Sequence, residues 1–133
     1  MSKNDSELTA SAMGAMGKAY APYSKFNVGA AIRDEHGNIH LGVNVENAAY
    51  PQGSCAEAGA IAAMVMAGGR KITAIAVAGG GEGLCTPCGG CRQRIREFAE
   101  ADTPIYICSE DQVKASFTLD LLLPESFGPD NLS

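Results

Sequence analysis

Cysteines stand in two short stretches of this 133-residue chain, at a spacing that suits one metal ion. The first stretch holds Cys55, and the second holds Cys85, Cys88 and Cys91. Residues i and i+3 on the first turn of a helix lie on one face, so the sulfurs of Cys88 and Cys91 can reach the same ion. Zinc prefers thiolate ligands, and the two stretches must fold together to complete such a site. The sequence therefore predicts a zinc site that joins two distant parts of the chain.

The number of thiolate ligands decides which kind of zinc site forms. Three ligands, Cys55, Cys88 and Cys91, leave the fourth tetrahedral position to water, as in catalytic zinc sites. A fourth thiolate from Cys85 would close the site and make it structural. Spacing alone leaves both arrangements open, and we favour the open one, because Cys85 suits an apolar position at the end of a loop. Cys108, in an apolar strand, is expected to be a buried small hydrophobe.

Glu57 follows Cys55 by two residues. On a helix its side chain leaves about 200° away from that of Cys55, so it is not expected to be a ligand. From the first turn it can still approach a water at the ion, where burial raises a carboxyl pKa and a cation lowers it. On its own, Glu57 would be a favourable charge at a helix N-terminus. Beside three cysteines with zinc spacing, we interpret it as a group that moves protons.

Three thiolates carry more negative charge than a site built with histidines, and this charge lowers the Lewis acidity of the metal. Arg92, directly after Cys91, is a candidate donor to a ligand sulfur that would offset the charge. It is equally well interpreted as a solvated charge on the helix surface. The sequence leaves these two interpretations open.

Periodicity and turn signals predict the element order α-β-β-α-β-α-β, a mixed sheet with helices on both faces. The helix over 55–69 is apolar nearly all round, which is typical of a buried helix. His36 and His40 lie in or beside a polar hairpin loop and are expected on the surface. The predicted helices cover 6–20 (capped by Ser6), 55–69, 88–101 and one turn at 118–123, and the predicted strands cover 27–33, 39–45, 72–78 and 104–108.

Composition narrows the class of partner. The net charge is −5 and the pI about 4.9. This excess of acidic residues does not provide the positive charge that binds nucleic acid, and it suits a small or neutral substrate. The first seven residues lack the apolar region of a signal peptide, and no run approaches the roughly 18 apolar residues of a membrane helix. We expect a cytoplasmic protein with no nucleic-acid or membrane partner. The number of cysteines is odd, five, which in a reducing compartment indicates metal or redox chemistry more than structural disulfides.

Several further segments resemble the small, homotetrameric, three-cysteine cytidine deaminases. The metal motif, Cys-Ala-Glu at 55–57 with Pro-Cys-Gly-Gly-Cys-Arg at 87–92, is shared by all zinc nucleobase deaminases. Asn-Val-Glu-Asn-Ala at 44–48 and Phe-Gly-Pro at 127–129 are more specific to cytidine deaminases, and Ala-Pro-Tyr-Ser-Lys-Phe from residue 21 also matches. The resemblance covers most of the chain. It implies an α/β fold of three layers, α-β-α, with a mixed, about five-stranded sheet, as a single zinc-dependent deaminase domain over 1–133.

The resemblance also implies which residues meet the substrate within one subunit. One zinc ion per subunit would bind the three cysteines. Asn44 and Glu46 would bind the ribose 3′-hydroxyl, and Phe26 would form an apolar wall for the pyrimidine. The backbone N–H of Ala56 would help to orient the hydroxyl or the base.

Other implied contacts cross between subunits of a homotetramer with shared active sites. Ala48 and Tyr50 would contact ligand in a neighbouring subunit, and Phe127 would stack over a neighbour's base. A phenylalanine in a polar tail bounded by Pro and Gly is hard to bury in its own monomer, which agrees with that role. The apolar helix over 55–69 suits packing at the centre of an oligomer.

The implied activity is hydrolysis of a cyclic amidine C–N bond. Cytidine and 2′-deoxycytidine would become uridine and 2′-deoxyuridine plus ammonia, a reaction of pyrimidine salvage. Glu57 would take a proton from the attacking water, deliver it to the ring nitrogen and then protonate the departing amine. Two alternatives are a blasticidin-type aminopyrimidine nucleoside deaminase and a non-catalytic four-cysteine zinc module, and the segment 44–48 favours a plain nucleoside.

One position departs from the pattern of the family. Three-cysteine members usually carry arginine directly after the catalytic glutamate, and Ala58 stands there in this chain. Arg92 alone would then offset the thiolate charge. We expect an active enzyme with a more electron-rich zinc and a pH–rate profile that Ala58→Arg changes.

Overall fold

The computed structural model describes residues 2–109 and 112–132. Its centre is a five-stranded sheet in the order β2-β1-β3-β4-β5, in which β3 and β4 are parallel and the other neighbours antiparallel. The mixed, about five-stranded sheet that was predicted is therefore confirmed. The strands are β1 (Val28–Asp34), β2 (Ile39–Val43), β3 (Ile72–Gly79), β4 (Pro104–Ser109) and β5 (Gln112–Thr118).

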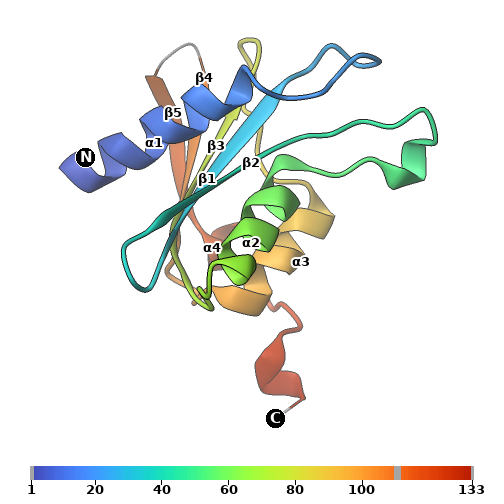
Figure 1. Cartoon of the computed structure of the whole chain (residues 1–133). Helices are drawn as coiled ribbons and strands as arrows, with labels where there is room; N and C mark the ends of the chain where they lie inside the picture. Colours follow the sequence, from blue (N-terminus) through green and yellow to red (C-terminus); the bar gives the residue numbers. More distant parts are fainter. Residues whose placement is uncertain (1, 110–111, 133) are drawn as a thin grey trace.

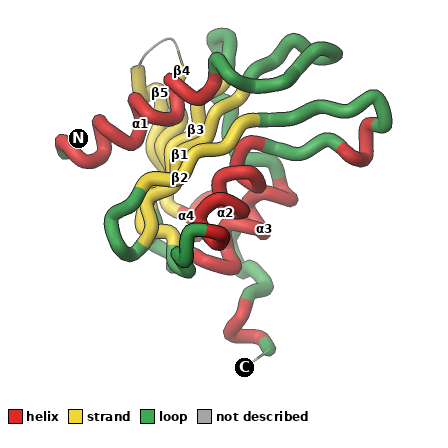
Figure 2. Tube along the Cα trace, in the orientation of Figure 1, coloured by secondary structure: helices red, strands yellow, loops and turns green. Residues whose placement is uncertain are grey.

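Helices cover both faces of the sheet (Figure 1). Helix α1 (Lys3–Met16) lies on one face, and α2 (Ala56–Met66) and α3 (Gly89–Phe98) lie on the other (Figure 2). The short helix α4 (Leu119–Leu122) follows β5 directly. Within the described residues, no helix combines the length and the apolar character that a membrane span requires. The three-layer prediction is confirmed.

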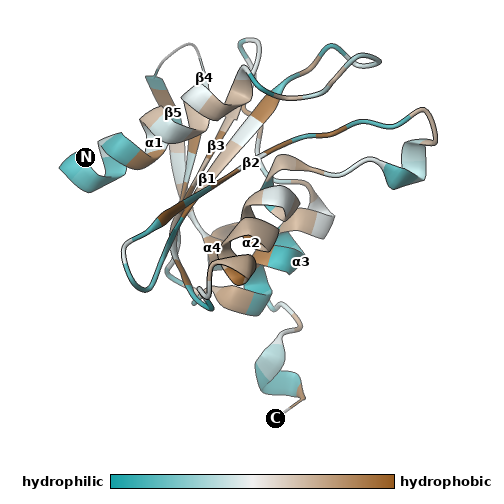
Figure 3. Cartoon of the chain, viewed as in Figure 1, coloured by the Kyte–Doolittle hydropathy of each residue, from teal (hydrophilic) through white to brown (hydrophobic). Residues whose placement is uncertain are grey.

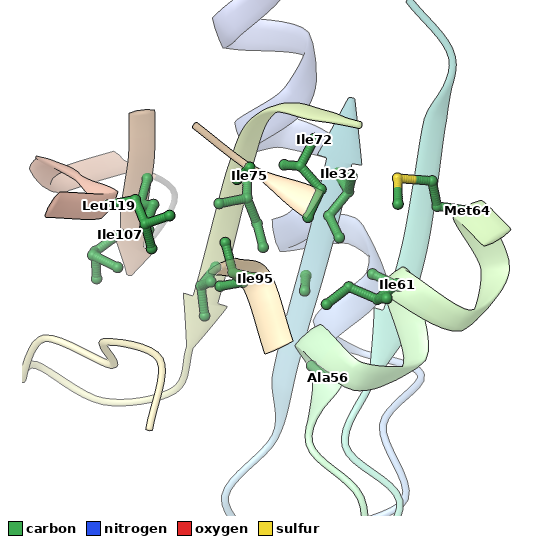
Figure 4. Packing of buried hydrophobic residues seen from close by; sticks show 14 of the residues in the cluster. Ile32, Ala56, Ile61, Met64, Ile72, Ile75, Ile95, Ile107 and Leu119 are labelled. Carbon is green, nitrogen blue, oxygen red and sulfur yellow. The ribbon is translucent and has the colours of Figure 1, made fainter. Parts of the chain in front are cut away.

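Two clusters of buried side chains hold these layers together. The larger cluster fills the space between the sheet and α2 and α3 with branched aliphatic residues (Figure 4). The smaller cluster lies under α1 and is rich in alanine, which lets the helix approach the sheet closely. A Cβ on Gly29 of β1 would lie 2.3 Å from the carbonyl oxygen of Ala12 and 2.5 Å from the backbone nitrogen of Met16. The larger cluster includes Ile32, Ile61, Met64, Ile72, Ile75, Ile95, Ile107 and Leu119.

Helix α2 is apolar on nearly every side, as Figure 3 shows, yet it is not buried on every side. Ala60 and Met64 face the core, whereas Ala62 and Met66 are exposed, Met66 to 89%. The prediction of an all-round buried helix is therefore wrong for the isolated chain. Only one face of a helix can pack on one sheet, and the opposite apolar face stays open to a partner.

Helix α1 begins earlier and ends earlier than predicted. Its N-cap is Ser2, whose Oγ accepts a hydrogen bond of 3.1 Å from the Asp5 backbone N–H, and Ser6 lies inside the helix. The predicted cap at Ser6 is wrong, because Ser2 offers the same capping chemistry one turn earlier. The helix ends at Met16, before Gly17, instead of near residue 20.

Strand β5 was not predicted, although the sequence carries its signal. Val113, Ala115 and Phe117 alternate with more exposed residues, and these three side chains are half-buried. Alternation with a period of two is typical of a strand. A register shift opposite Ile107 and Cys108 turns Val113 to the cluster under α1, on the other face from Ala115 and Phe117. β5 pairs with β4 and closes that edge of the sheet, so that Phe117 and Ala115 pack against the core.

The hairpin between β1 and β2 is held by a buried carboxylate. Asp34 Oδ1 accepts hydrogen bonds from the backbone N–H groups of His36 (2.8 Å) and Asn38 (3.0 Å), and Oδ2 lies 2.7 Å from His40 Nε2. The His40 side chain is only 9% exposed, so its predicted surface position is wrong, whereas His36 is exposed as predicted. Burial opposes ionisation of Asp34, but the hydrogen bonds outweigh it and hold the pKa of Asp34 below its ordinary value.

We predict that Asp34→Asn makes stability less dependent on pH in the acid range. A carboxyl with a depressed pKa contributes stability that is complete above its ordinary pKa near 4 and is lost as the pH falls through the folded-state value. At pH 7 the variant should melt about 3–8 °C below the parent protein, and the gap should narrow below pH 4. Melting curves from pH 3 to pH 7 measure this, with the exposed Asp102→Asn as control. An equal gap at every pH would contradict it.

Candidate metal centre and active site

The starts of two helices bring three cysteines together. Cys55 is the N-cap of α2, Cys88 is the N-cap of α3, and Cys91 lies on the first turn of α3. Their sulfur atoms all lie within 4.8 Å of one another, and those of Cys55 and Cys88 are 3.9 Å apart. Tetrahedral zinc with Zn–S bonds of about 2.3 Å requires sulfur atoms about 3.8 Å apart. The geometry and the chemistry of this donor set therefore fit a zinc ion.

Cys85 stands beside this group without joining it. Within the described part of the chain, the group of potential ligands contains only Cys55, Cys88 and Cys91. The Cys85 side chain instead packs against Gly79, where an added Cβ would lie 2.4 Å from the Cys85 Cβ. Burial raises the pKa of the Cys85 thiol to about 11. The structure therefore supports the open, three-ligand site over the closed, four-cysteine alternative. Cys108 is buried, as expected.

The electrostatic surroundings of the three thiols differ. Burial raises the pKa values of Cys55 and Cys91. The Cys88 pKa is lowered, chiefly because its sulfur accepts a hydrogen bond from the Cys91 backbone N–H at the start of α3. Free N–H groups and the positive end of a helix dipole favour a thiolate at this position.

Glu57 lies on the first turn of α2 and points inward. Its exposure is 4%, and it lines the same cavity as Cys55 and Cys88. Burial raises the pKa of the Glu57 carboxyl, whereas the N–H of its own residue and the charge of Arg94 act against that rise. A buried carboxyl with a raised pKa, next to a group of metal ligands, is a candidate to accept and release a proton.

A cavity of about 310 Å³ is lined by Cys55, Cys88 and Glu57. This size suits a small organic molecule. The buried sulfur of Cys91 lies within 4.8 Å of the other two ligand sulfurs, behind this lining. A second hollow of about 390 Å³ adjoins it, and the two share Glu46, Tyr50 and Gly53. The lining of the first cavity comprises Val28, Asn44, Val45, Glu46, Tyr50, Gly53, Ser54, Cys55, Ala56, Glu57, Cys85, Thr86 and Cys88.

The two predicted ribose-binding residues stand at the mouth of this cavity, after the end of β2. The Asn44 side chain donates to the Phe26 carbonyl oxygen (2.8 Å) and accepts from the Val28 backbone N–H (2.9 Å). The Glu46 carboxylate accepts from the Tyr23 N–H (2.9 Å) and from the N–H and hydroxyl of Ser24. Hydrogen bonds from Ser24 hold the pKa of Glu46 below its usual range. Both side chains thus fix the loop before β1 against the strand-end segment.

The remaining predicted substrate contacts lie in different places. Ala56 and Tyr50 line the cavity, whereas Phe26, Ala48 and Phe127 are not among its lining residues. The Phe26 ring lies close to Cys85, a lining residue, because a Cβ on Gly79 would lie 3.3 Å from Phe26 Cζ and 2.4 Å from Cys85 Cβ. Tyr50 is 78% exposed and Phe127 58%, so neither is buried within its own chain. The segment that carries Ala48 and Tyr50 projects outward between β2 and α2 (Figure 1).

Arg92 does not donate to a ligand sulfur in this structure. Its guanidinium donates to the carbonyl oxygens of Pro87 (2.7 Å) and Leu122 (2.8 Å) and to the Thr86 hydroxyl (3.3 Å). It is therefore neither a sulfur donor nor a free surface charge, but a brace between the loop before α3 and helix α4. The arginine that reaches a ligand sulfur is Arg94, which lies 3.7 Å from Cys91 Sγ. Its position three residues after Cys91 was the available signal for this contact.

The flank of α3 also anchors the C-terminal tail. Gln93 Nε2 donates to the Phe127 carbonyl oxygen (2.8 Å), and Arg96 Nε donates to the Ser126 hydroxyl (2.9 Å). The guanidinium lies against Gly128, where an added Cβ would lie 2.3 Å from the guanidinium carbon and would displace the end of the Arg96 side chain. The helix that carries two of the metal ligands therefore also fixes the segment around Phe127.

Three cysteine sulfurs placed to hold one ion and an adjacent buried carboxyl define a class of protein. Zinc sites of this kind activate water, and the carboxyl serves as general acid and base. The α-β-α fold and this site together are those of a zinc-dependent hydrolase.

Comparisons with known proteins identify the family. The family model described as "Cytidine and deoxycytidylate deaminase zinc-binding region" matches residues 2–107. A cytidine deaminase of Sporosarcina psychrophila is 42% identical over 127 residues, which cover 96% of this chain and 93% of the relative. The crystal structure of cytidine deaminase from Burkholderia pseudomallei has a TM-score of 0.86 at 38% identity and covers 96% of this chain and 100% of that one. Cytidine deaminase from Mycobacterium leprae gives a TM-score of 0.81 at 35% identity, covering 93% and 100%.

The chain belongs to the cytidine and deoxycytidylate deaminase family. The resemblance inferred from the motifs is thereby confirmed, and so is the prediction of a hydrolytic deaminase. The zinc cofactor is supported by the family description and by the group of three cysteine sulfurs.

Proposed function

We propose that this protein hydrolyses cytidine and 2′-deoxycytidine to uridine and 2′-deoxyuridine, with release of ammonia. The observation that carries the proposal is a group of three cysteine sulfurs within 4.8 Å of one another, beside a cavity that the buried Glu57 carboxyl also lines. Relatives that align over most of this chain are named cytidine deaminase, which supports the choice of substrate. A blasticidin-type substrate is less well supported, because Asn44, Val45 and Glu46 of the Asn-Val-Glu-Asn-Ala segment line the cavity.

Glu57 carries out the proton transfers of the proposed reaction. Zinc, when bound by the three cysteines, supplies a Lewis acid that lowers the pKa of water to about 7. Glu57 accepts the proton of the attacking water and passes it to the ring nitrogen beside the reacting carbon. It then takes the second proton from the hydroxyl group added to the ring carbon and passes it to the amine as the C–N bond breaks, so that water and cytidine give uridine and ammonia. Burial keeps the Glu57 carboxyl away from bulk water during both transfers.

Residues that line the cavity would orient the substrate. Asn44 and Glu46 would hold the ribose, and the Ala56 N–H, at the start of α2, would donate to the base or the attacking water. In this structure both ribose-binding side chains already hold the loop around Phe26. The proposal therefore has the sugar bind a preformed loop, with the Phe26 ring as an apolar wall for the pyrimidine.

We further propose a homotetramer in which subunits share active sites. Tyr50, Met66 and Phe127 are large apolar side chains with exposures of 78%, 89% and 58%, and Ala48 lies in the same projecting segment as Tyr50. Covering the open face of α2 and the segments around Tyr50 and Phe127 would bury these groups. Residues 1–133 would then act as one deaminase domain per subunit in pyrimidine salvage in the cytoplasm.

Spectrophotometric loss of cytidine absorbance, with and without a chelator, tests the proposed function. We expect turnover of cytidine and 2′-deoxycytidine, loss of at least 90% of it on removal of zinc, and recovery when one zinc ion per subunit is returned. Sedimentation of the same samples measures the oligomeric state. Absence of turnover in a zinc-loaded sample that retains its fold would contradict the proposed function, and a monomer would contradict the shared sites.

A further inference from the structure

The positive charge that contacts the cysteine cluster belongs to Arg94, whereas the sequence indicated Arg92 as the candidate. Arg94 Nη1 lies 3.7 Å from the sulfur of Cys91, within hydrogen-bonding range for sulfur. Cys91 is itself fully buried, so this sulfur has few other possible donors. The contact is local, because residues three apart on a helix are neighbours on its surface.

The sequence around Arg94 leaves room for this contact. A Cβ added to Gly90 would lie 3.3 Å from Arg94 Nη1, closer than most side-chain contacts allow. The guanidinium therefore folds back over the first turn of α3 across the space that Gly90 leaves. Arg92, the neighbour expected to take this role, is committed to the Pro87 and Leu122 carbonyl oxygens.

The negative charge of the cluster explains why a contact with an arginine would be favourable. Three thiolates and the Glu57 carboxylate carry four negative charges, and a divalent ion offsets only two. Arg94 faces both partners, because it donates to Cys91 Sγ and its charge also acts on Glu57. A hydrogen bond to a metal-bound thiolate draws electron density from the sulfur and makes the ion a stronger Lewis acid.

We propose that Arg94 is a positioning residue of the metal centre, which donates to the Cys91 sulfur and offsets the charge of the three-thiolate cluster. This inference rests on the proposed function and deepens it. It also replaces the expectation that Arg92 carries this role and that the alanine at position 58 leaves the metal electron-rich. In this chain, the compensating charge comes from α3 instead of α2.

The direct test is spectroscopic and needs no turnover. With cobalt(II) in place of zinc, the sulfur-to-metal charge-transfer band reports the electron density on the ligand sulfurs. Arg94→Gln should move this band to lower energy, Arg94→Lys should move it less, and Lys71→Gln, which removes an exposed charge elsewhere, should leave it in place. A folded Arg94→Gln protein that no longer retains cobalt, while Arg94→Lys does, supports the proposal equally. An unchanged band in Arg94→Gln overturns it.

The pH dependence of kcat/KM gives a second readout. Arg94→Gln should shift the acidic limb of the profile upward by about half a unit to one unit. Ala58→Arg alone should change the limb little, because Arg94 already offsets the charge, but it should reverse the shift in the Arg94→Gln background. A large effect of Ala58→Arg in the parent protein would overturn the proposal. If the cobalt band shifts and cytidine is not turned over, the proposed function fails and the role of Arg94 stands.

Discussion

Replacing Glu57 by glutamine should lower kcat for cytidine by about 10⁴-fold while the protein keeps its fold and its zinc. The carboxyl is 4% exposed, lines the cavity and is not a member of the sulfur group. Glutamine fills the same volume and can still donate and accept hydrogen bonds, but it cannot carry a proton between water and the base. The loss should therefore fall on kcat more than on KM.

Three measurements on the same sample test this prediction. Zinc content by atomic emission and the circular dichroism spectrum should match those of the parent protein, while cytidine turnover collapses. Glu97→Gln, an exposed position on α3, serves as the matched control and should keep full activity. Turnover within tenfold of the parent in Glu57→Gln would show that another group moves the proton.

Gly42→Ala should destabilise the protein by about 3 kcal/mol and reduce zinc retention with it. A Cβ at this position of β2 would lie 2.2 Å from the Ala56 carbonyl oxygen and 2.3 Å from the Ala60 backbone nitrogen. Both atoms belong to the backbone of α2, which cannot swing aside as a flexible side chain can. The helix must therefore move away from the sheet, and Cys55 and Glu57 move with its first turn.

The matched control is the same substitution in open space. Gly14 lies within α1, and a Cβ there meets no atom within 4 Å. Gly14→Ala should raise stability by about 0.5–1 kcal/mol, because alanine favours a helix interior. Melting temperatures and the rate of zinc transfer to a coloured chelator compare the two variants. A Gly42→Ala protein as stable as the parent would show that α2 does not depend on this close approach.

Much of the site could be predicted from residue types and spacing. Cys88 and Cys91 are three residues apart, which places them on the same face of a helix. Helices α2 and α3 do begin at the predicted ligands, with Cys55 and Cys88 as their N-caps. The strands over Ile72–Gly79 and Pro104–Ser109 also follow from their apolar runs, because buried parallel strands read as continuous hydrophobic segments.

Other features depend on contacts that are not local in the sequence. The bracing role of Arg92 requires Leu122, thirty residues away, and the need for glycine at position 42 arises only once α2 lies on β2. His40 was misplaced because a residue beside a polar turn looks exposed until Asp34 is known to point at it. The exposed face of α2 was missed for a different reason, since an apolar pattern does not say whether its own chain or a partner covers it.

Helix α3 has one further consequence for how the protein behaves as a whole. Its first turn presents Cys91 to the ion, and its flank holds the tail through Gln93 and Arg96. Ordering this helix for either task reduces the entropy that remains to be lost for the other. We therefore expect loading of the ion to favour docking of the C-terminal segment, and docking to raise the affinity for the ion by the same factor.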